Sequence, residues 1–371
     1  MNRILLFSFL FLSTLPLSAQ HHHTHDRVIR FPDVPGYHVL SCDFHQHTVF
    51  SDGSVWPDIR VQEALRDSVD AISLTEHLEY QPHQADIPHP DRNRAYQLAQ
   101  EEAKGSNLIV VNGSEITRDM PPGHTNAIFL TDANKLLHDD AMESFREAKR
   151  QGAFVFWNHP NWTAQRPDGV ATLTDMHRKM LAEGLLQGIE VINDVNFSDE
   201  AFQIALDQNL TLMGTSDIHG LIDWNYLVHE GGHRPVTLVL AKERSAESIR
   251  EALFAHRTVV YMNNTLAGRP EHLLPLLSAC IRVESAEYEG NTSVLKVALR
   301  NLGDSDLLLQ NQSGYTFHHD AGIVELHGNS QTVILVKTRE RLKSVELPFN
   351  VLNAFTAPGK ATSVRLTVEV H

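Results

Sequence analysis

Short apolar runs alternate with amphipathic stretches between residues 37 and 262. The apolar runs end in polar residues, as buried strands do. Between them, apolar residues recur at helical spacing, as in Val61, Ala64, Leu65 and Val69. Strands that alternate with helices in this way predict an α/β protein with a parallel sheet or barrel.

The same pattern places the individual elements. The expected strands cover residues 37–44, 71–75, 108–113, 126–130, 153–157, 188–193, 211–215, 236–241 and 258–262. The first expected helix begins at Pro57, a residue that the first turn of a helix tolerates. The later helices are expected over residues 94–104, 141–151, 173–184, 199–208 and 245–253.

The pattern changes from about Gly268, where helical periodicity stops. Short alternating segments follow, at 294–299, 332–336 and 364–368, with Asn-Gly, Gly-Asp and Pro-Gly turn signals between them. Segments of this kind predict a β-sandwich of roughly a hundred residues. We therefore expect a catalytic barrel over 37–267 and a β-sandwich over 268–371.

Residues 1–19 have the features of a secretory signal peptide. Arg3 precedes an apolar stretch over 4–17, and Leu17-Ser18-Ala19 is a small-residue cleavage site. The stretch is too short for a membrane span and ends at the histidine-rich run 21–25. We expect a periplasmic or secreted protein with a flexible, His-rich segment over 20–36 and no membrane span after cleavage.

Composition narrows the possible partners. The formal net charge of −15 argues against nucleic acid or an anionic membrane as the main partner. The two cysteines, Cys42 and Cys280, allow at most one internal disulfide, and we expect two free thiols because they fall in different predicted domains.

Chemically active side chains stand directly after the predicted strands. His45, His77, Glu115, His159 and Asp217 each follow such a strand. In a β/α barrel the carboxyl ends of the strands form the face on which active sites are built. Residues that are far apart in the sequence are therefore expected to converge there.

The candidate metal ligands combine imidazoles and carboxylates, which suit zinc, manganese or iron(II). Taken singly, His124 beside Gly123 and Asp52 beside Gly53 fit ordinary turns. Taken together, the set is hard to explain by packing. It consists of His45, His47, Asp52, His77, Glu115, His124, His159, Asp217 and His219.

These residues lie in an ordered series of short motifs. The series is His45-Gln46-His47 with Ser51-Asp52-Gly53, then Thr75-Glu76-His77, Gly113-Ser114-Glu115, His159-Pro160 and Ser216-Asp217-Ile218-His219. It resembles the PHP superfamily, named for polymerase and histidinol phosphatase. One departure is Glu76, where that family often has Asp. With the leader and the β-rich end, the chain is similar to secreted bacterial PHP phosphoesterases.

The resemblance implies a distorted (β/α)7 barrel followed by a small C-terminal β-sandwich, with two or three divalent ions, zinc, manganese or iron, at one site. By this resemblance, His45, His47, Glu115 and Asp217 hold one ion. Glu115 bridges to a second ion, held with His124 and His159. Asp52, His77 and His219 hold a third.

The activity implied is metal-dependent hydrolysis of a small phosphorylated substrate. Clustered ions lower the pKa of a shared water and neutralise phosphoryl charge, so that a metal hydroxide attacks phosphorus. The domain arrangement favours phosphodiesters. A phosphomonoesterase of the histidinol phosphatase type, an amide or lactone hydrolase and a non-catalytic binding module stay open, as does the oligomeric state. The leader and the acidic charge disfavour a polymerase-associated exonuclease.

Three further residues are candidates for contact with the substrate. Arg118 is placed to clamp phosphate, although a surface arginine is an equal alternative. His229 or His233 in the polar loop 220–234 is placed to protonate a leaving group. Weaker candidates are Arg166 and Arg234 for charge and Trp162, Trp224 and Tyr226 for the pocket wall.

Overall fold

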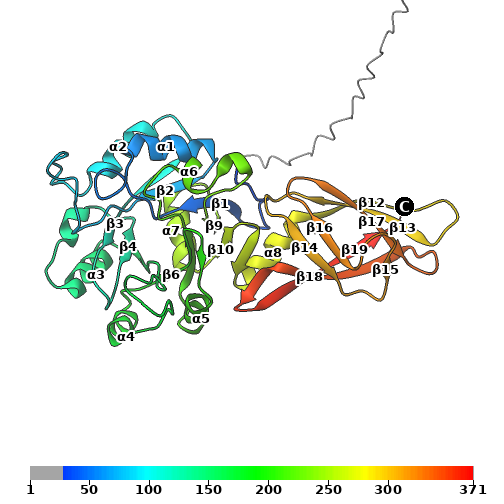
Figure 1. Cartoon of the computed structure of the whole chain (residues 1–371). Coiled ribbons are helices and arrows are strands. Elements are labelled where there is room, and N and C mark those ends of the chain that lie inside the picture. Colours follow the sequence, from blue (N-terminus) through cyan, green and yellow to red (C-terminus); the bar gives the residue numbers. More distant parts are fainter. Residues whose placement is uncertain (1–27, 371) are drawn as a thin grey trace, which may run out of the picture.

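The computed structural model describes residues 28–370, which form a barrel and a C-terminal β-rich part beside it (Figure 1). The predicted signal peptide and the histidine run 21–25 lie outside the described residues. Within residues 28–370, no helix combines the length and the apolar character that crossing a membrane requires.

Seven strands form the barrel wall, with helices outside it (Figure 1). In spatial order the strands are β1 (His38–Asp43), β2 (Ala71–Leu74), β3 (Ile109–Ile116), β4 (Thr125–Ile128), β5 (Phe154–Trp157), β6 (Gly188–Asn193) and β8 (Thr211–Thr215). The helices are α1 (Pro57–Arg66), α2 (Arg94–Glu102), α3 (Ala141–Arg150), α4 (Asp175–Ala182), α5 (Asp199–Asp207), α6 (Ile222–Asn225) and α7 (Ala246–Phe254). Two short 3₁₀ turns (Ala133–Leu136 and Val228–Glu230) and the two-residue strand β7 (Asn196–Phe197) complete this part.

The barrel closes only at its carboxyl rim. There, Gln46 and Ile218 form a parallel bridge between the segments that follow β1 and β8. Below this bridge β1 pairs instead with antiparallel β9 (Val236–Ala241), which pairs with β10 (Thr258–Met262). The two added strands hold β1 and β8 apart at the base, so the expected distorted barrel is confirmed.

One barrel strand runs against the others. β4 is antiparallel to both β3 and β5, so the parallel order that the alternation predicts is interrupted at this position. The loop 117–124 turns the chain back directly from the carboxyl end of β3 without a crossover helix. Consequently the residue that precedes β4, rather than the one that follows it, lies at the rim.

The C-terminal part is a sandwich of two sheets, as expected. One sheet contains β14 (Leu307–Asn311), β16 (Ile323–Leu326), β18 (Ser344–Ala357) and β19 (Lys360–Glu369). The other contains β12 (Ile281–Tyr288), β13 (Val294–Asn301), β15 (Thr316–Phe317) and β17 (Gln331–Lys337). The first sheet continues into the barrel sheet, because β18 pairs in parallel with β11 (Thr265–Gly268), which pairs with β10.

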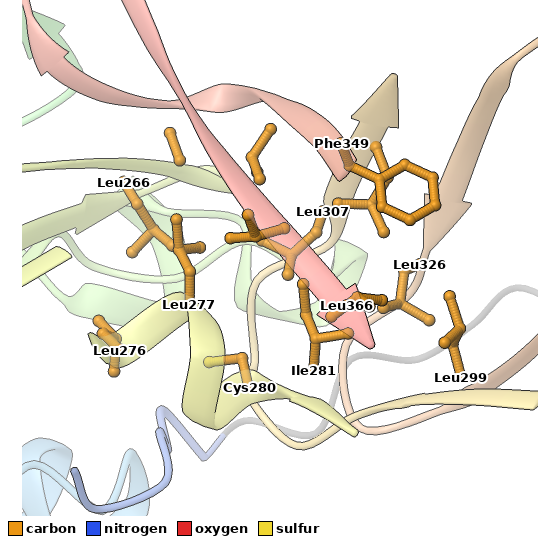
Figure 2. Close-up of a cluster of buried hydrophobic side chains, with 14 of the residues drawn as sticks. Leu266, Leu276, Leu277, Cys280, Ile281, Leu299, Leu307, Leu326, Phe349 and Leu366 are labelled. Atoms are coloured by element: carbon orange, nitrogen blue, oxygen red, sulfur yellow. The ribbon is translucent and has the colours of Figure 1, made fainter. Parts of the chain in front are cut away.

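A helix joins the two parts. α8 (Pro270–Cys280) contradicts the expectation that helical periodicity stops near Gly268. Its buried residues Leu273, Leu276, Leu277 and Cys280 do have helical spacing, but the internal Pro275 obscured it. Figure 2 shows this face of α8 packed with apolar side chains of the sandwich and of β11 in one cluster.

The segment before β1 also differs from the expectation. Residues 28–36 were included in a flexible stretch, but Ile29, Phe31 and Val34 are buried in the same cluster as α8. The ring of Phe31 meets that of Tyr261 edge-on at 5.0 Å. Apolar side chains therefore hold this segment against the barrel. The expectation of two free thiols is confirmed, since Cys42 and Cys280 are buried and unbonded to each other.

Candidate metal centre

Backbone bridges position the histidines at the carboxyl rim of the barrel. The amide of His47 donates to the carbonyl of Ile218 at 3.0 Å, and the amide of Asp217 donates to that of His45 at 2.9 Å. On the next pair of strands, His77 and Glu115 form a parallel bridge. The ligand candidates are thus continuations of sheet ladders, which fixes their spacing.

The turn after His47 brings Asp52 back toward the rim. The amide of Gly53 donates to the carbonyl of Thr48 at 2.9 Å. A Cβ at Gly53 would lie 2.6 Å from the carbonyl carbon of His47, closer than real side chains come. Only glycine fits this close approach. Gly53 of the Ser51-Asp52-Gly53 motif is therefore a steric requirement of the turn that delivers Asp52.

The first group of donor atoms is compact and buried. Nε2 of His45, Nε2 of His47 and Oδ1 of Asp217 lie 3.1 Å from one another in each pairing. The carboxylate oxygens of Glu115 lie 3.5 Å from Nε2 of His45 and 3.8 Å from Nε2 of His47. Ligand atoms that share one ion at about 2.1 Å are about 3 to 3.5 Å apart, so the spacing fits a cation.

The other ring nitrogens show which atoms carry lone pairs. Nδ1 of His45 contacts the Glu190 carboxylate at 2.8 Å, and Nδ1 of His47 contacts the Ser51 hydroxyl at 3.2 Å. With Nδ1 of each ring donating to these partners, both Nε2 atoms present lone pairs to each other and to Asp217. Such a cluster of acceptors is unfavourable unless a cation or a proton lies among them.

A second group surrounds Glu115. Its Oε1 lies 3.1 Å from Nδ1 of His124 and 3.6 Å from Nε2 of His159. The side-chain amide of Asn158 donates to the same oxygen at 2.7 Å. Nδ1 of His159 is buried and has no hydrogen-bond partner among the described residues. An orphaned buried nitrogen of this kind is expected where a further ligand belongs.

A third group surrounds Asp52. Its two oxygens lie 3.1 Å from Nε2 of His219 and 3.3 Å from Nε2 of His77. Nδ1 of His77 lies 2.5 Å from Oε2 of Glu115, which links this group to the second. The structure thus brings all nine candidates to one rim, but the closest donor atoms are not grouped as the resemblance implied. His47 also lies with the Asp52 group, and His77 also lies with Glu115 and His124. Metal binding by the nine candidates stays a prediction, which these distances support.

The electrostatics favour a site that accepts cations. Burial alone would raise the pKa of Glu115, but the charges of His77 and His124 hold it well below its usual range. Burial and the charges of His77 and His219 lower the pKa of His47 to about 3. Burial opposes protonation of His77, but Glu115 and Asp52 raise its pKa to about 10. Ionised carboxylates and a neutral His47 are the forms that bind metal, whereas His77 must release its proton when a metal binds.

Two supporting carboxylates were not predicted from the sequence as part of the site. Glu190, in the apolar strand β6, receives hydrogen bonds from the amide of His159 at 2.6 Å and the hydroxyl of Thr215 at 2.6 Å, besides contacting His45. Glu76 receives hydrogen bonds from the hydroxyls of Thr48 and Ser51, both at 2.5 Å. A charged residue inside an otherwise apolar strand, Gly-Ile-Glu-Val-Ile-Asn, was the available signal for Glu190.

The three predicted substrate residues have other partners. Arg118 pairs with Glu79 at 2.9 Å and donates to the carbonyls of Asp139 and His138. This geometry disagrees with the phosphate clamp, because the guanidinium is directed at these neighbours.

The two histidines of the loop 220–234 differ from each other. His233 stacks on Tyr261 at 4.5 Å, and both its ring nitrogens bond to backbone atoms, of Arg234 and Asn263. Both nitrogens are thus engaged, so this geometry does not support a role as proton donor, which stays a prediction. His229 has a side chain that is 70% exposed and lies 3.5 Å from Glu230, and its role stays a prediction.

Of the weaker candidates, one lies beside the donor atoms. The ring of Trp162 lies 5.1 Å from that of His159 and 5.7 Å from that of His124. Arg234 is buried in ion pairs with Asp43 and Asp67. Tyr226 is buried, with its hydroxyl donating to the carbonyl of Ser216. The sequence did not single out Tyr80, whose ring lies 5.7 Å from that of His77.

Comparison with known proteins gives one strong similarity. A crystal structure of a two-domain protein from Bacteroides vulgatus, containing a predicted PHP-like metal-dependent phosphoesterase, shares 42% identity. The match covers 92% of this chain and 98% of that one, with a TM-score of 0.85. A metal-dependent phosphoesterase from Bifidobacterium adolescentis shares 17% identity over 50% of this chain and 90% of that chain, with a TM-score of 0.39.

The C-terminal part matches a family model described as an Ig-like domain, over residues 281–367. Among curated proteins, none matches this chain. The similarity to the Bacteroides vulgatus structure extends over both the barrel and the sandwich.

Proposed function

This chain belongs to the PHP-like metal-dependent phosphoesterases, and we propose that it hydrolyses small phosphoesters, with phosphodiesters preferred, at the centre around Glu115. The proposal rests on the position of Glu115, whose two carboxylate oxygens face different candidate metal ligands. One oxygen faces His124 and His159, and the other faces His77. A carboxylate in this position is suited to bridge neighbouring cations.

The nine residues fit two or three divalent ions, of zinc, manganese or iron. The mixed imidazole and carboxylate donors suit all three metals. When bound, such ions supply a water of lowered pKa and positive charge for the phosphoryl oxygens. Positive charge at this point allows a protein with a net charge of −15 to bind an anion.

The residues of the chain itself hold the ligands in place. Glu190 receives a hydrogen bond from the amide of His159 and contacts Nδ1 of His45. Ser51 contacts Nδ1 of His47 and donates to Glu76. These contacts fix which nitrogen of each imidazole faces the centre, so its donor atoms are preorganised.

The preference for diesters and the location outside the cytoplasm are parts of the proposal. The two-domain arrangement with an Ig-like C-terminal part is consistent with a secreted enzyme. The predicted leader over residues 1–19 supports the same location. His229 is the one candidate proton donor in the loop 220–234 that is not engaged with backbone atoms.

Elemental analysis together with hydrolysis tests this proposal. The chain should begin after His25, so that the histidine run 21–25 does not bind stray metal. We expect two to three metals per chain and cleavage of bis(p-nitrophenyl) phosphate faster than of p-nitrophenyl phosphate. Metals without either activity would favour an amide or lactone hydrolase. No tightly bound metal after reconstitution would contradict the assignment of the centre.

A single substitution tests the ligand assignment. His45→Ala removes a donor atom that lies 3.1 Å from both His47 and Asp217. We expect this variant to lose hydrolysis and to bind less metal while circular dichroism shows the chain still folded. Unchanged activity would show that the reaction occurs elsewhere.

A further inference from the structure

Two exposed aromatic side chains lie next to the metal centre. Trp162 is 44% exposed and Tyr80 is 52% exposed, although aromatic side chains are usually buried. Tyr80 contacts the ring of His77 at 5.7 Å, and Trp162 contacts the ring of His124 at 5.7 Å. The rings of His77 and His124 are themselves 5.4 Å apart. Each exposed aromatic is therefore in contact with a histidine of the centre, and these two histidines contact each other.

Packing alone does not account for these two positions. The Trp162 ring meets the imidazoles of His124 and His159 at interplanar angles of 57° and 69°. The Tyr80 ring meets that of His77 at 70°. These tilted and edge-on contacts leave part of each aromatic side chain exposed to solvent, directly next to the donor atoms. Ring surface in that place is suited to stack on a flat group of a bound molecule.

The arginines considered as phosphate clamps are not available to stack on such a flat group. Arg118 is paired with Glu79, and Arg234 is buried in its own ion pairs. Arg166 donates to the carbonyl of Thr172. The two aromatic side chains, by contrast, offer exposed surface next to the donor atoms, where the part of the substrate without the phosphoryl charge would lie.

We propose that Trp162 and Tyr80 form a stacking subsite, and that the substrates are small phosphoesters whose alcohol part carries a flat ring. This inference rests on the proposed function, because it places the phosphoryl group at the metal centre. It adds the class of alcohol that the site selects.

Binding of two non-hydrolysable phosphonates tests the subsite. Phenylphosphonate carries a flat ring and methylphosphonate does not, while both offer the same anionic group to the metals. We expect calorimetry on the metal-loaded chain to show about 10-fold tighter binding of phenylphosphonate. Because neither compound is cleaved, the result does not depend on the reaction. If the chain hydrolyses no phosphoester but still binds phenylphosphonate more tightly than methylphosphonate, the proposed function is overturned and the subsite stands.

Substitutions assign the preference to its residues. Trp162→Leu keeps apolar bulk over the two histidines but removes the flat ring, and Trp162→Phe keeps a ring. We expect the ratio of the two affinities to fall to about 2-fold in Trp162→Leu and in Tyr80→Ala, and to persist in Trp162→Phe. Binding of methylphosphonate and the metal content should stay at the wild-type values.

A third aromatic at the same rim provides the control. Trp56 is 49% exposed, but its ring contacts Phe50 rather than a histidine of the centre. Trp56→Leu should therefore keep the full ratio. Equal binding of both phosphonates by the wild type, or an unchanged ratio in both Trp162→Leu and Tyr80→Ala, would overturn the subsite. Loss of bound metal in both Trp162 variants would assign that ring to holding the ligands, which also overturns it.

Discussion

The Glu190 carboxylate contacts Nδ1 of His45 at 2.8 Å, and both side chains are completely buried. Glu190 also receives hydrogen bonds from the backbone of His159, from Thr215 and from Asn193. One carboxylate inside β6 thus connects ligand candidates that follow two other strands. An anion behind a ligating imidazole fixes its tautomer and increases its basicity.

Glu190→Gln should weaken metal binding while the chain stays folded. The amide is uncharged and brings an NH₂ group into a site where every neighbour donates. We expect a loss of about 10- to 100-fold in metal affinity, measured by competition with a chromogenic chelator. Glu247→Gln, at a position that is 82% exposed on α7, is the control and should bind metal normally. Equal affinity in the two variants would show that Glu190 does not support the centre.

Removing the metals should lower the thermal stability of the chain. The donor atoms around His47 and Asp217 crowd at 3.1 Å, and without a cation that crowding costs free energy. At a free metal concentration 100 times the dissociation constant, binding adds about 2.7 kcal/mol to the free energy of unfolding. Scanning calorimetry with and without a chelator measures the shift. Zinc or manganese added back should restore the melting temperature. A melting temperature that is unchanged both by the chelator and by added metal would contradict a metal bound at this site.

Arg234 should matter for stability rather than for binding phosphate. Its guanidinium is fully buried and pairs with Asp43 at 3.3 Å and Asp67 at 2.7 Å. Arg234→Met leaves these carboxylates without their cation, so we expect a loss of about 3 to 5 kcal/mol in the free energy of unfolding, measured by urea denaturation.

Arg244→Met is the matched control for this experiment. Arg244 pairs with Asp70 at 2.8 Å, but its side chain is 54% exposed. An exposed pair contributes about 0 to 1 kcal/mol, so this variant should unfold near the wild-type urea concentration. Similar losses of unfolding free energy in both variants would show that the buried ion pairs contribute no more to stability than the exposed one.

The barrel and the sandwich should unfold together. Leu277 of α8 belongs to one buried cluster with Leu266 of β11 and Phe349 of β18 (Figure 2). We expect Leu277→Ala to lower the free energy of unfolding by about 2 to 5 kcal/mol and to shift a single transition, followed by both circular dichroism and tryptophan fluorescence. Leu274→Ala, at a position on the same helix that is 36% exposed, should cost far less. Two separate transitions would show that the parts are independent.

Hydrophobic periodicity was enough to predict the strands of the barrel, their alternation with helices and the residues that follow each strand. The reason is local: a buried strand needs a continuous apolar run, and polar residues that follow it lie at the rim. His45, His77, Glu115, His159 and Asp217 could therefore be grouped before any contact was known. Gly53 was part of the motif, but its steric reason appears only where its turn contacts His47.

Which groups meet across the barrel depends on how the chain folds in three dimensions. β4 runs antiparallel because of the hairpin after β3, and no local pattern encodes strand direction. The partners of Glu190, Arg118 and His233 come from segments distant in the sequence, so residue type alone did not distinguish a support or a packing contact from a substrate contact. Side-chain roles of this kind depend on long-range neighbours, whereas periodicity records only whether a position is buried.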